Sequence, residues 1–282
     1  MYINNIKKQY DEKDQSLYGS KRITDLLALL YQENSKLDKF TSRAQGETIQ
    51  YFQDPYITQR TIQPYKIYPA PLKKYSQPIN KVSNDLLNVL KNRRSTRNFD
   101  ANYKISLNEL LTVFHYSYGI THTSKIPSTN HSINYRSVPS AGALYPLEIY
   151  TSLFKSNIES GLFHFQETDN SLELIKKGIH LERLKEIINA EPYVAISDAC
   201  GVIFITSLIE RVCIKYGERG YKFILQEVGY VSMVMSLLFE QLGLGSCLIG
   251  SCLDDQVNEY LGIDGIYENI QAIIIFGKKA NE

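Results

Sequence analysis

The spacing of apolar residues predicts an alternation of helices and strands over most of the chain after residue 80. Apolar residues recurring every three to four positions indicate helices, whereas short apolar runs rich in Val and Ile indicate strands. Helices are predicted at residues 23–31, 84–92, 106–118, 179–190, 221–242 and 254–261. Strands are predicted at residues 147–154, 161–166, 172–176, 201–209, 246–249 and 270–276. This mixture predicts an α+β domain built on one sheet.

Three of these elements have clear local signals. Ser106 is the expected N-cap of its helix, Glu109 completes a capping box, and Gly119 follows the last turn. Residues 201–209 form a nearly unbroken apolar run with β-branched side chains, as is typical of a strand buried on both faces. The helix at 221–242 is apolar around much of its circumference, so we expect it in a core or a subunit interface.

The first 80 residues follow a different pattern. One helical stripe is followed by a stretch in which five of the nine prolines fall between residues 55 and 78. Proline fixes φ and lacks a backbone donor, so this stretch should be extended and irregular. We therefore expect residues 1–80 to form an N-terminal arm lying on a core domain of residues 81–282.

Composition and charge narrow the possible functions. The chain has 31 Lys and Arg against 30 Asp and Glu, and this net charge of +1 gives no general reason to bind nucleic acid. No apolar run in the sequence approaches the roughly 18 residues needed to cross a bilayer, and the N-terminus lacks a secretory pattern. We expect a cytoplasmic protein without a membrane segment. Four cysteines lie at no metal-ligand spacing, which favours unpaired structural thiols and no metal: Cys200, Cys213, Cys247 and Cys252.

A basic, hydroxyl-bearing segment follows the helix at 84–92. It contains Arg93, Arg94, Ser95, Thr96 and Arg97. Guanidinium groups match the oxygens of a phosphate, and a hydroxyl donates one more hydrogen bond, so the segment suits a phosphate monoester. The alternative is a solvated basic helix end, which the helix dipole also favours.

A turn of small residues leads into the strand at 147–154. Its sequence, PSAGALYPLE, occupies residues 139–148. Small side chains let a flat ligand approach the backbone closely, and glycine permits unusual dihedral angles. The alternative is an ordinary loop before a strand.

A lysine and a tyrosine lie between the strand at 201–209 and the long helix. We place Lys215 and Tyr216 in a loop at the helix entry, where reactive groups are often held. Partial burial beside Arg219 and Lys222 would lower the pKa of Lys215, so that it acts as a base. The alternative is a polar helix entry with a solvated lysine. Further on, Gly250 ends a strand, whereas Gly243 and Gly245 suit helix capping.

These segments, in this order, resemble the nitroreductase-like flavoprotein superfamily, and more narrowly the SagB-type azoline dehydrogenases of thiazole/oxazole-modified peptide biosynthesis. The resemblance covers residues 65–279. It rests on four motifs: PYKIYP at 64–69, RRSTRNF at 93–99, PSAGALYPLEIY at 139–150 and KYGERGYKF at 215–223. The second is shared across the superfamily, and the third is much more specific to the SagB-type branch.

The resemblance implies a fold, a cofactor and roles for individual residues. The fold would be a central, mostly antiparallel sheet flanked by helices, in an intertwined homodimer with two FMN sites built from both subunits. The catalytic pair would be Lys215 and Tyr216. The FMN phosphate and ribityl chain would be held by Arg93, Arg94, Ser95 and Arg97, with Lys278 as a further phosphate contact. The isoalloxazine would be lined by Pro139, Ser140, Ala141 and Gly142, and approached at N5 by the backbone of Ile249 and Gly250.

The implied activity is FMN-dependent dehydrogenation of a peptide-borne or carrier-borne thiazoline or oxazoline to the azole, alongside a cyclodehydratase. Two alternatives stay open. One is an NAD(P)H-dependent nitro- or quinone reductase on the same fold. The other is a non-catalytic flavin-binding scaffold subunit of a peptide-modifying complex.

Overall fold

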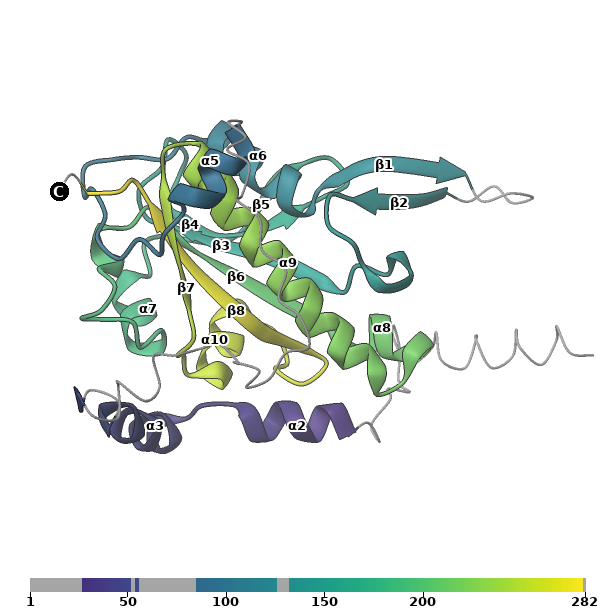
Figure 1. Cartoon of the computed structure of the whole chain (residues 1–282), viewed down its shortest axis with the longest axis horizontal. Helices are drawn as coiled ribbons and strands as arrows, with labels where there is room; N and C mark the ends of the chain where they lie inside the picture. Colours follow the sequence, from purple (N-terminus) through teal and green to yellow (C-terminus); the bar gives the residue numbers. More distant parts are fainter. Residues whose placement is uncertain (1–26, 52–53, 56–84, 126–131, 281–282) are drawn as a thin grey trace, which may run out of the picture.

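The chain is built around one six-stranded antiparallel sheet in the order β5-β4-β3-β6-β8-β7 (Figure 1). The computed structural model describes residues 27–51, 54–55, 85–125 and 132–280. The strands of the sheet are β3 (Leu147–Leu153), β4 (Gly161–Gln166), β5 (Ser171–Lys177), β6 (Gly201–Leu208), β7 (Gly245–Ile249) and β8 (Glu268–Gly277). The predicted α+β fold with a mostly antiparallel central sheet is confirmed.

Helices cover both faces of this sheet. They are α5 (Asp85–Asn92), α6 (Leu107–Tyr118), α7 (Leu181–Ile187), α8 (Ile209–Tyr216), α9 (Arg219–Gln241) and α10 (Asp254–Leu261). In β6, Ile203 and Ile205 pack into the core beneath α6 and α9, whereas Val202 and Phe204 pack into the core with α7 and α10. Because alternate side chains of a strand point to opposite faces, the continuous apolar run of β6 fills both cores.

Helix α9 crosses one face of the sheet (Figure 1). Met235 and Phe239 are fully buried, and the Phe239 ring stacks on Phe276 of β8 with centroids 5.0 Å apart. By length and composition alone, α9 could cross a membrane. The apolar runs in the sequence did not predict such a helix. The packing of α9 against the sheet identifies it as a core helix. Its outer face leaves Leu225, Tyr230 and Met233 exposed.

Several predicted elements are confirmed closely. Helix α6 has Ser106 as its N-cap, and the reciprocal bonds of the capping box with Glu109 are both present. Helix α10 has the predicted bounds, and β4 and β5 form the predicted hairpin. Helix α7 is shorter than predicted. All four cysteines are unpaired, as expected, and Cys200, Cys213 and Cys247 are buried.

Two helices and one hairpin were not predicted. Helix α8 follows β6 directly, in a region that the sequence suggested was strand end and loop. Strands β1 (Ile120–Lys125) and β2 (Ser132–Arg136) form a separate hairpin that projects from the body (Figure 1). Helix α3 (Lys39–Tyr51) contains Gly46 and has no apolar face that would have revealed it. It lies beneath the sheet beside α2 (Leu27–Ser35), which covers part of the predicted helix at 23–31.

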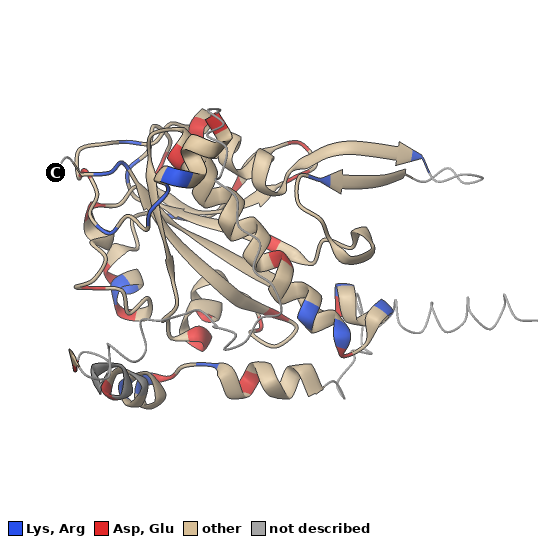
Figure 2. Ribbon diagram, viewed as in Figure 1, with Lys and Arg blue, Asp and Glu red and all other residues tan. Residues whose placement is uncertain are grey.

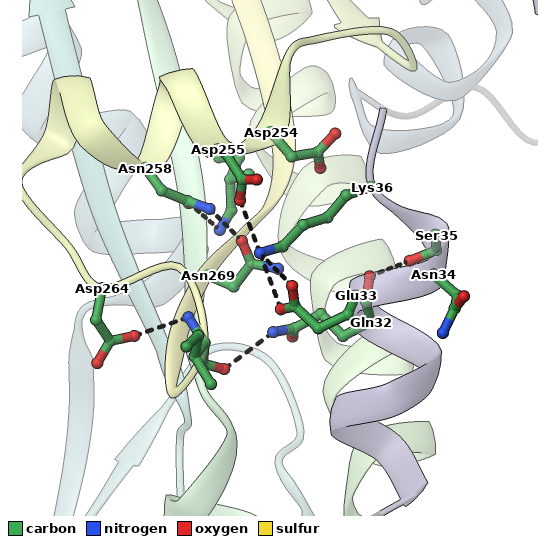
Figure 3. A network of polar contacts seen from close by, with 12 residues as sticks. Gln32, Glu33, Asn34, Ser35, Lys36, Asp254, Asp255, Asn258, Asp264 and Asn269 are labelled. Carbon is green, nitrogen blue, oxygen red and sulfur yellow. Dashed lines mark hydrogen bonds and ion pairs between the residues drawn. The ribbon is translucent and has the colours of Figure 1, made fainter. Parts of the chain in front are cut away.

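Helix α2 is held on the core by polar contacts at both ends, and Figure 3 shows those at its C-terminal end. At its start, the carboxylate of Glu218 accepts hydrogen bonds from the backbone N–H groups of Leu27 and Ala28, at 2.7 and 2.9 Å. Near its end, the ammonium group of Lys36 contacts Asp255 at 2.8 Å. The predicted boundary at residue 80 and most of the proline-rich stretch lie outside the described residues, so both stay predictions.

Candidate functional site

The small-residue loop of residues 139–147 has a tight, left-handed turn at its centre. Ser140 precedes a short 3₁₀ turn, η1 (Ala141–Ala143), and its hydroxyl oxygen accepts a hydrogen bond from the backbone N–H of Tyr145 at 2.9 Å. Gly142 has φ +64° and ψ +18°, and Ala143 and Tyr145 also have positive φ. Left-handed conformations are unfavourable for residues with a Cβ, and such strain concentrates at functional sites.

The structure brings this loop against the lysine–tyrosine pair. A Cβ atom on Gly142 would lie 2.7 Å from both the Lys215 Nζ and the Tyr216 hydroxyl oxygen. The Lys215 Nζ is also 5.3 Å from the centre of the Tyr216 ring. Gly142, Lys215 and Tyr216 therefore form one small cluster, although 73 residues separate the first two in the sequence.

The pair lies in the last turn of α8, which corrects its predicted place in a loop. Its predicted environment was also wrong, because Lys215 is exposed in this chain. The guanidinium carbon of Arg219 lies 5.6 Å from the centre of the Phe223 ring. The Tyr216 ring meets the same Phe223 ring edge-on, with centroids 5.2 Å apart.

Arg211, one turn before Lys215 on α8, fastens that helix to the loop. Its guanidinium donates to the backbone oxygen of Tyr145 at 3.0 Å and pairs with the Glu148 carboxylate at 2.6 Å. Residues four apart on a helix share a face, so Arg211 and Lys215 both point toward the loop. Sequence reasoning missed Arg211. Its spacing from Lys215 was a usable signal only once α8 was known to be a helix.

A buried carboxyl group supports the loop from below. Glu227 of α9 is 2% exposed, and the Tyr118 hydroxyl donates to its Oε1 at 2.8 Å. Burial raises the pKa of the Glu227 carboxyl, and hydrogen bonds from Ser140 and Tyr118 act in the opposite direction on this pKa. The sequence offered one signal for Glu227, since it lies in the same helical row as the buried residues Ile224 and Val231.

The basic segment lies at the other end of α9, near the C-terminus (Figure 2). It crosses the end of the sheet in extended form, with the N–H of Thr96 donating to the oxygen of Ser246 at 2.9 Å. Phe99 is buried and anchors the segment. A pocket of about 480 Å³ opens there, lined by Asn92, Arg94, Ser95, Thr96, Arg97, Asn98, Lys279 and Ala280.

The guanidinium groups of this segment are available to an anion. Arg94 donates only to backbone oxygens of its own helix end, Arg97 makes one long contact to a backbone oxygen, and Arg93 is half-buried beside them. Among the described residues, no carboxylate pairs with any of the three. Lys279 is different, because the Glu240 carboxylate pairs with its ammonium group at 2.7 Å.

Of the residues predicted to hold the phosphate and ribityl chain or to approach flavin N5, four do not line this pocket: Arg93, Lys278, Ile249 and Gly250. The ammonium group of Lys278 donates to the backbone oxygen of Gly243 at 2.8 Å, and Lys279 rather than Lys278 lines the pocket. Ile249 and Gly250 lie at the far end of β7 and line a smaller cavity of about 200 Å³ beside α2. At 3.3 Å per residue, Ile249 lies about 10 Å along the strand from Ser246, the residue that bonds to Thr96 of the basic segment.

The predicted residues thus form two groups on this chain. Arg93, Arg94, Ser95 and Arg97 lie near one end of α9, and Ile249 and Gly250 lie along β7 from them. The loop of residues 139–147 meets the lysine–tyrosine pair at the other end of α9. Tyr118 links this loop to Glu227, which lies 14 residues before the last residue of α9, or about 21 Å along the helix at 1.5 Å per residue, so the two groups are separate within one chain.

Comparisons with known proteins agree with this architecture. The model of the nitroreductase family matches residues 90–278. The protein MJ1384 of Methanocaldococcus jannaschii, which is named as a nitroreductase, is 30% identical over 184 residues, covering 63% of this chain and 84% of that protein. The microcin B17-processing protein McbC of Escherichia coli is 23% identical over 134 residues, covering 46% of this chain and 49% of McbC.

Two solved structures share the fold. A chain of the E. coli microcin synthetase McbBCD complex, with truncated pro-MccB17 bound, has a TM-score of 0.60 at 18% identity, covering 93% of this chain and 100% of that one. A protein described as a nitroreductase from Anabaena variabilis has a TM-score of 0.56 at 24% identity. That match covers 70% of this chain and 38% of the Anabaena chain, so this chain spans well under half of that relative.

Proposed function

This chain belongs to the nitroreductase family of flavin-binding oxidoreductases, and we propose that it uses FMN to oxidise peptide-borne thiazolines or oxazolines to azoles. One observation carries the proposal: Gly142, in the motif most specific to SagB-type dehydrogenases, lies against both tips of the Lys215–Tyr216 pair. Two segments distant in the sequence supply the residues that this chemistry requires, and they meet.

The reaction removes two hydrogens from the azoline ring, one as a proton and one with an electron pair. Bound FMN supplies the acceptor for the electron pair and its hydrogen. In our proposal the Lys215 amine takes the proton from the ring Cα, and the Tyr216 hydroxyl orients the ring or assists the proton transfer. Because Gly142 has no side chain, its backbone approaches both groups closely.

The chemistry of the basic segment fits the phosphate end of FMN. Arg93, Arg94 and Arg97 offer guanidinium groups that have no carboxylate partner among the described residues. Of these, Arg94 and Arg97 line the pocket, and Ser95 adds a hydroxyl to it. In our proposal these residues hold the phosphate and ribityl chain, with Ile249 and Gly250 toward the reactive end of the flavin. Lys278 is the weakest of the proposed phosphate contacts, because its ammonium group is already bonded to Gly243.

The separation of the two groups of residues supports a site shared between two copies of the chain. The arginines lie near the last turn of α9, about 21 Å along the helix from Glu227, the residue that Tyr118 links to the loop of residues 139–147. We propose an intertwined homodimer in which a second copy supplies the loop. The exposed Leu225, Tyr230 and Met233 on α9 give this interface an apolar surface.

Similarity to McbC extends the proposal to partners. The related E. coli protein processes microcin B17, and the structural relative belongs to a synthetase complex with a bound precursor. By analogy, we propose that this chain acts in the cytoplasm with a cyclodehydratase that forms the azoline rings.

The test begins with the purified protein, which should be yellow and release FMN on denaturation. A synthetic thiazoline peptide incubated with it should lose the mass of two hydrogens. Lys215→Ala and Tyr216→Phe should abolish this loss while retaining bound FMN. The controls Lys177→Ala and Tyr193→Phe alter exposed side chains outside the site and should leave it unchanged. Unimpaired oxidation by the Lys215 variant would remove this lysine from the mechanism.

The similarity to MJ1384 favours one alternative, an NAD(P)H-dependent nitro- or quinone reductase. Rapid bleaching of the bound flavin by NADPH, with no azole formed, would support that activity. Complex-dependent activity that survives substitution of both Lys215 and Tyr216 would instead support a non-catalytic scaffold.

A further inference from the structure

The buried carboxyl of Glu227 has no part in the reaction as proposed, yet it lies directly beneath the loop of residues 139–147. Its neighbours on the buried side of α9 are apolar, including Ile224, Val228 and Val231. An acidic group at such a position lowers stability unless hydrogen bonds compensate for its lost hydration. The hydrogen-bond partners of the Glu227 carboxyl therefore indicate its structural role.

One of these hydrogen bonds leads to the end of the loop. The Tyr118 hydroxyl donates to Glu227 Oε1 at 2.8 Å and accepts from the backbone N–H of Leu147 at 3.0 Å. Tyr118 is 1% exposed, so water does not compete for either bond. The hydroxyl thus links the carboxyl to the residue where the loop becomes β3.

A second link leads to the start of the loop. The Ser140 side chain lies close enough to the Glu227 carboxyl to lower its pKa, and the Ser140 hydroxyl oxygen accepts from the N–H of Tyr145 at 2.9 Å. The carboxyl is therefore bonded to the loop after Gly142 through the Tyr118 hydroxyl, and it lies beside Ser140 before Gly142. The contacts of Gly142 with Lys215 and Tyr216 lie between these two points.

We infer that Glu227 is a positioning residue, whose carboxyl holds the loop of residues 139–147 so that Gly142 stays against the tips of Lys215 and Tyr216. The catalytic consequence rests on the proposed function, whereas the structural consequence does not. Hydrogen bonds in a water-excluded site hold a group firmly, and a displacement of about 1 Å at a reacting group lowers a rate on the order of a hundredfold.

Amide hydrogen exchange tests the inference without any substrate. Glu227→Ala should speed exchange at Tyr145 and Leu147 at least about tenfold, with smaller changes elsewhere in the sheet. Ser232→Ala is the matched control, because Ser232 is a buried residue of α9 whose hydroxyl has no described partner. It should leave exchange in the loop unchanged. Glu227→Gln keeps an acceptor oxygen for one hydroxyl, so it should restore slow exchange at one of the two amides.

A second readout follows azole formation at saturating FMN. Glu227→Ala should lower kcat on the order of a hundredfold, with partial recovery in Glu227→Gln. If the wild-type protein leaves the thiazoline peptide unchanged, the proposed function fails while the exchange measurement still tests the positioning role. If Glu227→Ala does not fold, Tyr118→Phe removes one hydroxyl only and should speed exchange at Leu147. Wild-type exchange in the loop of the folded variant, or a uniform rise over the whole chain, would overturn the inference.

Discussion

Replacing Gly142 with alanine tests two properties of this position: its left-handed backbone conformation, and the lack of space for a Cβ atom beside Lys215 and Tyr216. Gly142 has φ +64°, and the left-handed conformation costs a residue with a Cβ about 1–2 kcal/mol. The new methyl would lie 2.7 Å from the Lys215 Nζ and the Tyr216 hydroxyl, well inside ordinary contact distances. Both tips must therefore withdraw by about 1 Å, and azole formation should fall on the order of a hundredfold.

Gly262 provides the matched control. It has φ +80° and ψ +27° at the end of α10, and a Cβ there meets nothing within 4 Å. Gly262→Ala should therefore lower the free energy of unfolding by about 1–2 kcal/mol, as is expected for Gly142→Ala, but should leave the rate of azoline oxidation unchanged. Urea unfolding followed by circular dichroism gives the first quantity, and the mass loss of the thiazoline peptide gives the second. Equal oxidation rates in the two variants would refute the crowding argument.

Three further predictions concern the cofactor, pH and the N-terminal helix. Arg97→Ala should weaken FMN binding about 10- to 100-fold while leaving riboflavin binding unchanged, because only FMN has the phosphate that this guanidinium would bind; a titration of flavin fluorescence measures both. Glu148 hydrogen-bonds to His164 and raises its pKa above the ordinary 6.5, so this contribution to stability is complete below about 6.5 and is lost as pH rises through the raised value. His164→Gln should therefore lower the free energy of unfolding at about pH 6 and have little effect at about pH 9, and an equal loss at both would contradict the assignment. Glu218→Ala removes both acceptors at the start of α2 and should destabilise the docked helix by about 1 kcal/mol, seen as faster amide exchange in α2 with β6 unaffected.

Much of the fold could be predicted from the sequence because its signals are local. The capping box of Ser106 and Glu109 identifies α6 directly, and the apolar run of β6 identifies a strand covered on both faces. The failures also have local causes. Strand β1 is largely exposed and lacks an alternating pattern, and the apolar end of β6 runs into α8 without a break. No turn residue marks that junction.

The candidate site was only partly predictable, for a different reason. The residue types of Lys215, Tyr216 and Gly142 could be recognised from motifs, but their contact depends on how β3 and α8 pack in three dimensions. Arg211 and Glu227 have no motif of their own and acquire a role only through partners distant in the sequence. The burial of Lys215 was predicted from its neighbours in the sequence, whereas the structure leaves this side chain exposed.

The docking of α2 bears on how fragments of this protein should be designed. The family match begins at residue 90, but Glu218 holds the first amides of α2 and Gln271 of β8 contacts Gln32 on the same helix. Among the described strands, β7 pairs only with residues 273–277 of β8. Within these strands, the earlier part of β8 therefore has a free edge on that side, and α2 lies beside this edge through the contact of Gln32 with Gln271. A truncated protein that begins at residue 90 would lack α2 and expose that strand edge to solvent, and exposed strand edges promote aggregation. Recombinant work should therefore keep the residues upstream of the match.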